Sequence, residues 1–184
     1  MINRIFTPFP ALTTARLTLR QLSIDDAENV FALRSSPEIN KYIDRQPSKK
    51  IEDAINFINK INDNIKKNNS LYWAVTFTNN PALIGTICLF SFSDEENKCE
   101  IGYELLTNFQ GEGIMQEAAK AVVDYAFYTL QFQKIEAATH NKNQSSISLL
   151  NKLGFQQSME KNTEGPDYNV FILANSIDNT PVKS

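Results

Sequence analysis

Apolar and polar residues alternate in several short segments, as they do in strands with one buried face. The first segment, residues 15–22, sets three leucines against two arginines and a threonine. Three further segments, 71–77, 83–92 and 99–105, have strand composition and are separated by turns rich in Asn, Asp, Glu and Pro. These three segments predict an antiparallel meander.

Two helices are predicted in the first third of the chain. Ser23 offers an N-cap to a short helix that should reach about Arg34, and Pro37 should stop its continuation. Ser48 is the predicted N-cap of a second helix, in which isoleucine recurs every three or four residues over 51–65. This spacing gives the second helix one apolar stripe.

The second half of the chain continues with alternating helices and strands. Apolar periodicity predicts a helix over 118–130, and residues 134–139 have strand composition. A helix is expected over roughly 145–153, where Gly154 is a typical C-terminal stop. Two strand-like segments, FQQSMEK and YNVFILA, then flank a turn through NTEGPD.

These elements predict one α+β domain with a mixed, mainly antiparallel sheet of about seven strands and about four helices. A chain of 184 residues is long enough for one domain with a sizeable core and short for two. We expect the core to span about residues 15–175. The N-terminal arm 1–14 and the tail 176–184 should be peripheral.

Composition narrows the class of protein. The net charge of -3 and the pI of about 5.3 argue against binding to nucleic acid, which requires a basic surface. No run of 18 apolar residues and no signal peptide is present, so we expect a cytoplasmic protein with no membrane partner. Cys88 and Cys99 should be reduced, and with a single histidine no metal site is predicted.

The segment QGEGIMQEA, residues 110–118, leads from a loop into a helical pattern and holds two of the six glycines. The start of a helix exposes unpaired N–H groups and the positive end of the helix dipole, which attract anions. Gly111 and Gly113 would let the backbone approach a phosphate closely, although a simple tight turn is the alternative. The spacing is neither GxGxxG after a first strand nor GxxxxGK[ST], which argues against the common nucleotide folds.

The same segment resembles the Q/R-x-x-G pyrophosphate loop of the GNAT superfamily of acetyl-CoA-dependent N-acetyltransferases. Downstream, Asn143 and Ser146 followed by LGF at 153–155 resemble the N-x-x-S…LGF segment of that superfamily. The opening RLTLRQLSIDDAENVFALRSSPEI is similar to the Rim-type (RimJ/RimL) branch of ribosomal-protein N-terminal acetyltransferases. The resemblance spans residues 15 to about 173.

The resemblance implies a splay between the fourth and fifth predicted strands, residues 99–105 and 134–139. This splay would hold the pantetheine arm of acetyl-CoA, and the loop amides would hold the pyrophosphate. The cofactor-binding residues implied are Tyr103, Leu105, Leu106, Gln110, Gly111, Glu112, Gly113, Ile114, Met115, Gln116, Asn143 and Ser146. Two residues depart from the pattern. Met115 stands where the superfamily usually has Gly or Ala, and Gln110 stands where the branch often has Trp.

Acetyl transfer requires a neutral amine, yet protein amino termini have a pKa of about 8 and lysines about 10.4. Glu100 and Glu104 share one strand face and are the candidates for the base, with a solvent-facing strand edge as the alternative. Many relatives place an acidic tyrosine four residues before the glycine of LGF, and here that position is Leu150. Ser146 is the predicted substitute, with a plain role at the helix N-terminus as the alternative.

The branch implies a protein or peptide amino terminus as the acceptor, with a small amine such as a polyamine or an antibiotic as the alternative. A CoA-binding regulatory module without catalysis is the second alternative, because of the missing tyrosine and Met115. A monomer or a homodimer would suit the branch.

Overall fold

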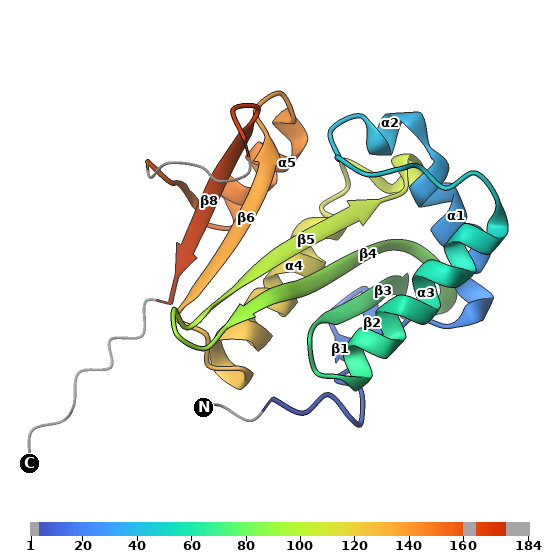
Figure 1. Ribbon diagram of the computed structural model, residues 1–184, viewed down its shortest axis with the longest axis horizontal. Helices are drawn as coiled ribbons and strands as arrows, with labels where there is room; N and C mark the ends of the chain where they lie inside the picture. The colour runs from blue at the N-terminus through green and yellow to red at the C-terminus, as the bar shows by residue number, and fades with distance from the viewer. Residues whose placement is uncertain (1–3, 160–164, 176–184) are drawn as a thin grey trace, which may run out of the picture.

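The computed structural model describes residues 4–159 and 165–175, and they form one sheet with helices on both faces (Figure 1). The eight strands run in the order β1-β2-β3-β4-β5-β6-β8-β7. Their bounds are Leu12–Thr13, Leu17–Gln21, Leu71–Phe77, Asn80–Ser93, Lys98–Leu105, Lys134–His140, Gln156–Gln157 and Tyr168–Ala174 for β1 to β8 in turn. The predicted α+β class and the meander β3-β4-β5 are confirmed.

Five α-helices are present in the described residues, one more than predicted. Their bounds are Ala27–Ser35, Pro37–Asn40, Ile51–Lys66, Ile114–Asp124 and Gln144–Lys152 for α1 to α5 in turn. A single π-helical turn, Tyr125–Thr129, extends α4. The predicted helices over 118–130 and 145–153 are therefore confirmed, with the first beginning earlier.

Two predicted helix signals act differently in the structure. Pro37 ends α1 but also begins α2, because proline is tolerated in the first turn and the Ser36 hydroxyl accepts from the Ile39 amide. The N-cap of α3 is Lys50 and not Ser48. Asp53, in the first turn, accepts hydrogen bonds from two backbone amides that precede the helix, so its side chain caps the helix.

The short strand β1 was not predicted, because two residues show no alternation. It pairs with β2 and draws the N-terminal arm onto the sheet, where Phe6 is only 1% exposed. The arm therefore supplies a core residue, although we expected it to be peripheral. The tail 176–184 and most of the turn after β7 lie outside the described residues.

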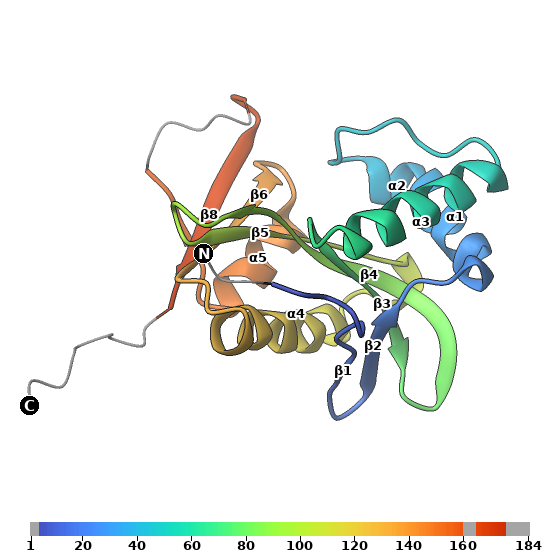
Figure 2. The same ribbon diagram turned by 60° about the horizontal axis from the view of Figure 1, so that its bottom comes forward.

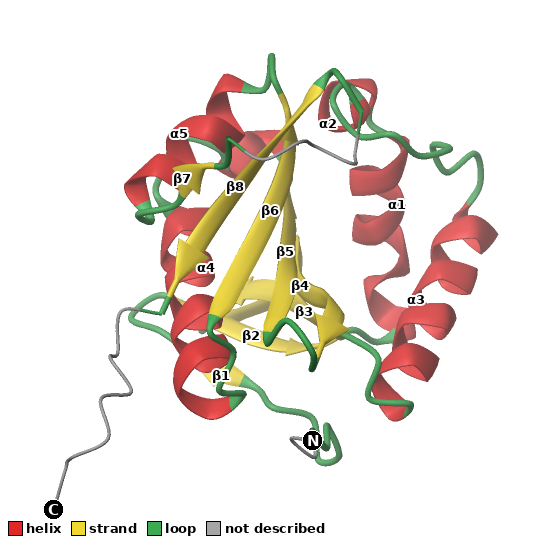
Figure 3. Cartoon of the chain, turned by 60° about the vertical axis from the view of Figure 1, so that its left-hand side comes forward, coloured by secondary structure: helices red, strands yellow, loops and turns green. Residues whose placement is uncertain are grey.

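The helices form two layers, one on each side of the sheet (Figures 2 and 3). α1 and α3 pack on each other and on β3 and β4, whereas α4 lies on the opposite side against β1 and β2. The apolar stripe of α3 is confirmed, with Ile58 and Ile65 buried against the sheet. Within the described residues, no helix has the length and apolar character needed to cross a membrane.

The parallel pair β5 and β6 separates after three residues. Pairing joins Lys98–Glu100 to Lys134–Glu136 and goes no further. On its other edge, β6 pairs with β8 along its whole length. Figure 1 shows the two strands diverging from this point. The predicted splay is confirmed, and it opens a gap in an otherwise continuous sheet.

Candidate active site

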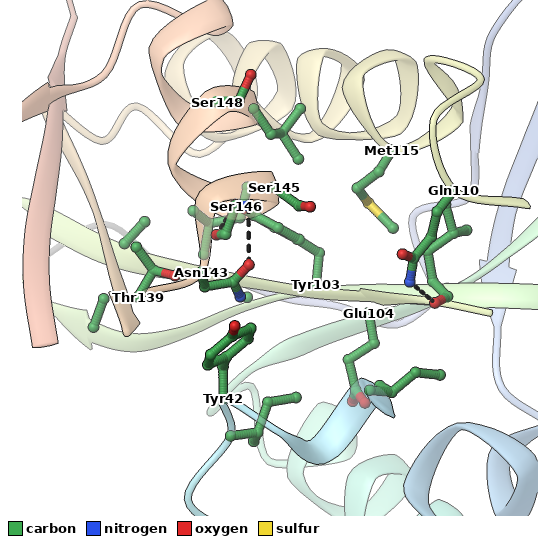
Figure 4. Close-up of a pocket in the computed structure, with 18 of the residues that line it drawn as sticks. Tyr42, Tyr103, Glu104, Gln110, Met115, Thr139, Asn143, Ser145, Ser146 and Ser148 are labelled. Carbon is green, nitrogen blue, oxygen red and sulfur yellow. Dashed lines mark hydrogen bonds between the residues drawn. The ribbon is translucent and has the colours of Figure 1, made fainter. Parts of the chain in front are cut away.

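A cavity of about 970 Å³ opens at the splay between β5 and β6. Its lining includes the end of β5, the loop into α4, the first turns of α5 and the segment between α2 and α3, together with residues of β4, β6 and β8. Figure 4 shows side chains from both helix layers pointing into this space. The cavity therefore connects the two sides of the sheet.

The loop before α4 presents a row of unpaired amides to the cavity. Gly111 and Gly113 have φ values of +82° and +72°, in the left-handed region that favours glycine. Within the described part of the chain, none of the amides from 111 to 116 has a hydrogen-bond partner. These donors, together with the N-terminus of α4, fit the pyrophosphate that the resemblance implies.

Arg16 and Glu117 hold this loop in place. The Arg16 Nε donates to Glu117 at 2.6 Å, and its terminal nitrogens reach the Glu112 carbonyl at 3.3 and 3.4 Å. Glu117 also accepts from the Thr14 hydroxyl and the Arg16 amide, at 2.5 and 2.9 Å. Burial pushes the pKa of Glu117 upward, but these hydrogen bonds outweigh it and leave that pKa below its ordinary value.

Gln110 and Met115 are the two departures from the superfamily pattern, and both line the cavity. The side-chain amide of Gln110 donates a hydrogen bond to the Leu105 carbonyl at 3.0 Å, which connects the loop to the end of β5. Met115 is 7% exposed, and Figure 4 shows its thioether pointing into the cavity. A side chain therefore occupies space that Gly or Ala would leave open.

The first turn of α5 faces the loop across the cavity. Asn143 is the N-cap of this helix, and its Oδ1 accepts from the Ser146 amide at 3.2 Å. The Ser146 hydroxyl lies 2.8 Å from the Tyr103 hydroxyl on β5. Burial raises the pKa of Tyr103 to about 12, against the smaller lowering effect of this hydrogen bond.

Glu104 lies on the other side of the sheet and is paired with Arg45. The guanidinium donates to both carboxylate oxygens, at 2.7 and 2.5 Å, and the two side chains are only 9% and 14% exposed. Arg45 is itself held by the Asn40 side chain at 2.5 Å. Glu104 is therefore not a residue of a solvent-facing strand edge.

All but three of the predicted site residues line the cavity. Glu100 lies outside the lining, beside β6 in register with Glu136. Leu106 is turned to the β4 side, where its amide donates to the Ile84 carbonyl at 2.9 Å. Glu112 is outside the lining as well, with its carbonyl directed to Arg16. Of the two candidates for the base, Glu104 lines the cavity and Glu100 does not.

Tyr42, Arg45 and Thr139 line the cavity but were not predicted. The Tyr42 ring lies 5.3 Å from the His140 ring, which lies 5.5 Å from that of Tyr168, so a row of aromatic rings links the α2–α3 segment to β6 and β8. The α2–α3 segment has no periodicity from which a role could be predicted. In the part of the chain that is described, no cluster of side chains suited to a metal ion occurs.

Comparison with known proteins identifies the class to which this chain belongs. A family model described as "Acetyltransferase (GNAT) domain" matches residues 16–156. An uncharacterized N-acetyltransferase p20 of Bacillus licheniformis is 37% identical over 147 residues, covering 79% of this chain and 82% of that protein. The chain therefore belongs to the GNAT acetyltransferase family, whose acetyl donor is acetyl-CoA.

Solved structures of low sequence identity share the fold. A putative ribosomal-protein-serine acetyltransferase from Vibrio cholerae has a TM-score of 0.77 at 22% identity, over 91% of this chain and 99% of that one. RimL, the ribosomal L7/L12 α-N-protein acetyltransferase, was solved in complex with CoA. Its TM-score is 0.76 at 16% identity, over 90% of this chain and 98% of that one. The fold is thus shared with acetyltransferases named for ribosomal proteins.

Proposed function

We propose that this protein transfers the acetyl group of acetyl-CoA to the amino terminus of a protein or peptide, by direct attack in a ternary complex. The observation that carries the proposal is that one cavity is lined both by the loop with unpaired amides and by Glu104. A donor on the α4 side and an acceptor on the α2 side would meet in the gap between β5 and β6.

The donor is assigned to the loop and to the edge of β5 that β6 leaves. The amides of 111–116 would hold the pyrophosphate, and Asn143 would contact the pantetheine arm from α5. The stretch of β5 after Glu100 has no strand partner on the β6 side, so its backbone around Tyr103 and Leu105 is placed to pair with the arm.

Glu104 is the proposed base for the acceptor amine. Arg45 donates one hydrogen bond to each carboxylate oxygen of Glu104. A carboxylate has about four lone-pair sites in all, so sites on both oxygens stay available. The remaining sites can accept a hydrogen bond from an ammonium group and then its proton. The neutral amine would attack the acetyl carbon, which the splay would hold within reach.

A polypeptide acceptor is favoured by the open surface beside the cavity. Figures 1 and 3 show that no helix of the described residues lies over the face of β5, β6 and β8 that adjoins α2. An extended chain could lie there with its amino terminus at Glu104. The fold that this protein shares with acetyltransferases named for ribosomal proteins also supports this choice.

A small amine with two cationic groups is the second candidate. Glu38 and Asp44 are exposed carboxylates in the cavity lining, and either one could hold a second ammonium group. Lys41, which is exposed beside them, weakens this attraction.

A direct test is the release of CoA thiol from acetyl-CoA with three acceptor sets: amino-terminal peptides, polyamines and aminoglycosides. We expect release above background hydrolysis with the peptides, and peptides blocked at the amino terminus serve as the matched control. Faster release with polyamines would favour the second candidate. Binding of CoA without release from any acceptor would contradict catalysis and favour a regulatory module.

Glu104→Gln tests the proposed base. The substitution should lower kcat and shift its pH profile, because the amide cannot take a proton. Glu100→Gln is the matched control on the same strand, outside the cavity lining. Identical profiles for wild-type protein and Glu104→Gln would remove Glu104 from the mechanism.

A further inference from the structure

Two hydroxyl groups meet at the splay between β5 and β6. The Tyr103 and Ser146 oxygens are 2.8 Å apart, and both residues line the cavity. Figure 4 shows the Tyr103 side chain running from β5 toward the first turn of α5. The N-cap bond from Asn143 fixes that turn, so the position of the serine is set by the helix. The pair therefore lies in the lining of the same cavity as the loop before α4 and Glu104.

We propose that Tyr103 is the acid that protonates the departing thiolate of CoA, and that Ser146 orients the phenol. The inference rests on the proposed function. The amine nitrogen forms a bond to the acetyl carbon, the C–S bond breaks, and its electron pair stays on sulfur. The Tyr103 O–H proton passes to the sulfur. The resulting tyrosinate is reprotonated through solvent by a proton that the amine has released.

Tyr103 is better suited to this step than Ser146. A phenol is a stronger acid than an alkyl hydroxyl, so its proton is transferred to a thiolate at a lower cost. Burial raises the pKa of Tyr103 to about 12, so the phenol keeps its proton at neutral and mildly alkaline pH. The serine hydroxyl can at the same time accept from the phenol or donate to it, which holds the ring in place.

The other phenols in the cavity lining are packed elsewhere, and the Tyr168 ring lies 5.5 Å from the His140 ring. Leu150, the position where relatives carry a tyrosine, is fully buried in the core and has no proton to give. The Tyr72 hydroxyl is bonded to Thr86 at 3.2 Å, on the face of the sheet that α3 covers. Tyr42 packs against His140 on the α2 side. Tyr103 is the phenol that reaches the donor side of the splay.

The first experiment compares Tyr103→Phe with Ser146→Ala in the full chain. Tyr103→Phe should lower kcat about a hundredfold, the usual contribution of a general acid, and leave the Kd for acetyl-CoA within about twofold. Ser146→Ala should lower kcat less, by about tenfold, because the phenol remains. Tyr125→Phe is the control, since this half-buried tyrosine packs on Trp73 outside the cavity lining. A large loss in Ser146→Ala with full activity in Tyr103→Phe would overturn the assignment.

The second experiment replaces Tyr103 with a fluorotyrosine, which keeps the ring and the hydroxyl but makes the phenol more acidic. The alkaline limb of kcat should move to lower pH, and the same replacement at Tyr125 should not move it. Burial raises the pKa of Tyr103, and the Ser146 hydrogen bond opposes this effect. An unmoved limb would limit Tyr103 to a structural role.

The two proposals fail in different ways. Wild-type protein without turnover on any acceptor would reject the proposed function. Wild-type turnover that Tyr103→Phe leaves unchanged would reject only the acid. Thermal unfolding of each variant shows whether a loss of rate comes from a loss of fold, and Tyr103→Phe should unfold near the wild-type temperature because its ring is retained.

Discussion

The proposed donor side and the proposed acceptor side of the cavity are built in different ways. The proposed donor side is a contiguous stretch of backbone, 111–116, whose amides have no hydrogen-bond partner among the described residues. The acceptor side depends on side chains that are distant in sequence, such as Arg45 and Glu104, which are 59 residues apart. A ligand common to a whole family can be bound by backbone geometry, whereas an acceptor that differs between relatives must be recognised by side chains.

The difference has an energetic side as well. The donor loop needs little burial, because its glycines and its amides act at the surface of a helix end. The acceptor side places an ion pair of 9% and 14% exposure next to the cavity, so each charge depends on its partner. Substitutions on the acceptor side should therefore disturb stability, and substitutions on the donor side should chiefly disturb ligand affinity.

The largest effect is expected from Arg45→Met. Removing one member of a buried ion pair leaves the other charge uncompensated, which should lower the free energy of unfolding by about 3 kcal/mol. The double variant Arg45→Met/Glu104→Leu should regain most of this loss, since no isolated charge remains. Denaturant unfolding of the two variants measures both values.

Lys120→Met is the control for that comparison. Lys120 pairs with Asp124 at 3.0 Å, but the two side chains are 72% and 46% exposed. Its loss should change stability by less than about 0.5 kcal/mol. Equal destabilisation in the single and the double variant at the buried pair would mean that packing, and not charge, explains the effect.

The next effect concerns the donor side, where Gly113→Val should weaken acetyl-CoA binding by tenfold or more, about 1.4 kcal/mol. At φ +72° a β-branched residue is strained, and its Cβ would lie 3.8 Å from the Arg16 guanidinium that holds the loop. Isothermal titration with acetyl-CoA measures the Kd. Unchanged affinity would remove the loop from the donor site.

Gly154→Val separates strain from binding in that experiment. Gly154 follows α5 with φ +89°, so the substitution brings a similar backbone strain of roughly 1–2 kcal/mol. It lies at the opposite end of α5 from Ser146 and does not line the cavity. Its Kd for acetyl-CoA should stay near the wild-type value while its unfolding temperature falls.

The same contrast explains what could be predicted from the sequence. The glycine loop before α4 is local and could be predicted, because one contiguous stretch of backbone defines it. The Asn143 cap is equally local, but Asn143 was predicted only as a cofactor-binding residue. The pairing of Arg45 with Glu104 joins an irregular segment to a strand, and no spacing or periodicity connects them. The strand β1 and the helix α2 were missed for a simpler reason, since two and four residues show no period.

The smallest effect is expected where the donor loop does depend on a side chain. Glu117→Gln removes the charge that holds Thr14 and Arg16 beneath the loop. Because Arg16 is 46% exposed and solvent screens the pair, stability at neutral pH should fall by only about 1 kcal/mol. Affinity for acetyl-CoA should fall by a small factor, since the loop loses an anchor and keeps its amides.

The pH dependence of that effect has a definite sign. The folded pKa of Glu117 is lower than the ordinary value of 4.5, so its contribution is complete above pH 4.5 and disappears as the pH falls through the folded pKa. The stability difference between wild-type protein and Glu117→Gln should therefore shrink on acidification. Glu112→Gln, an exposed carboxylate of the same loop, should show little difference at any pH. A wild-type advantage that persists at low pH would mean that the Glu117 side chain acts through packing and not through its charge.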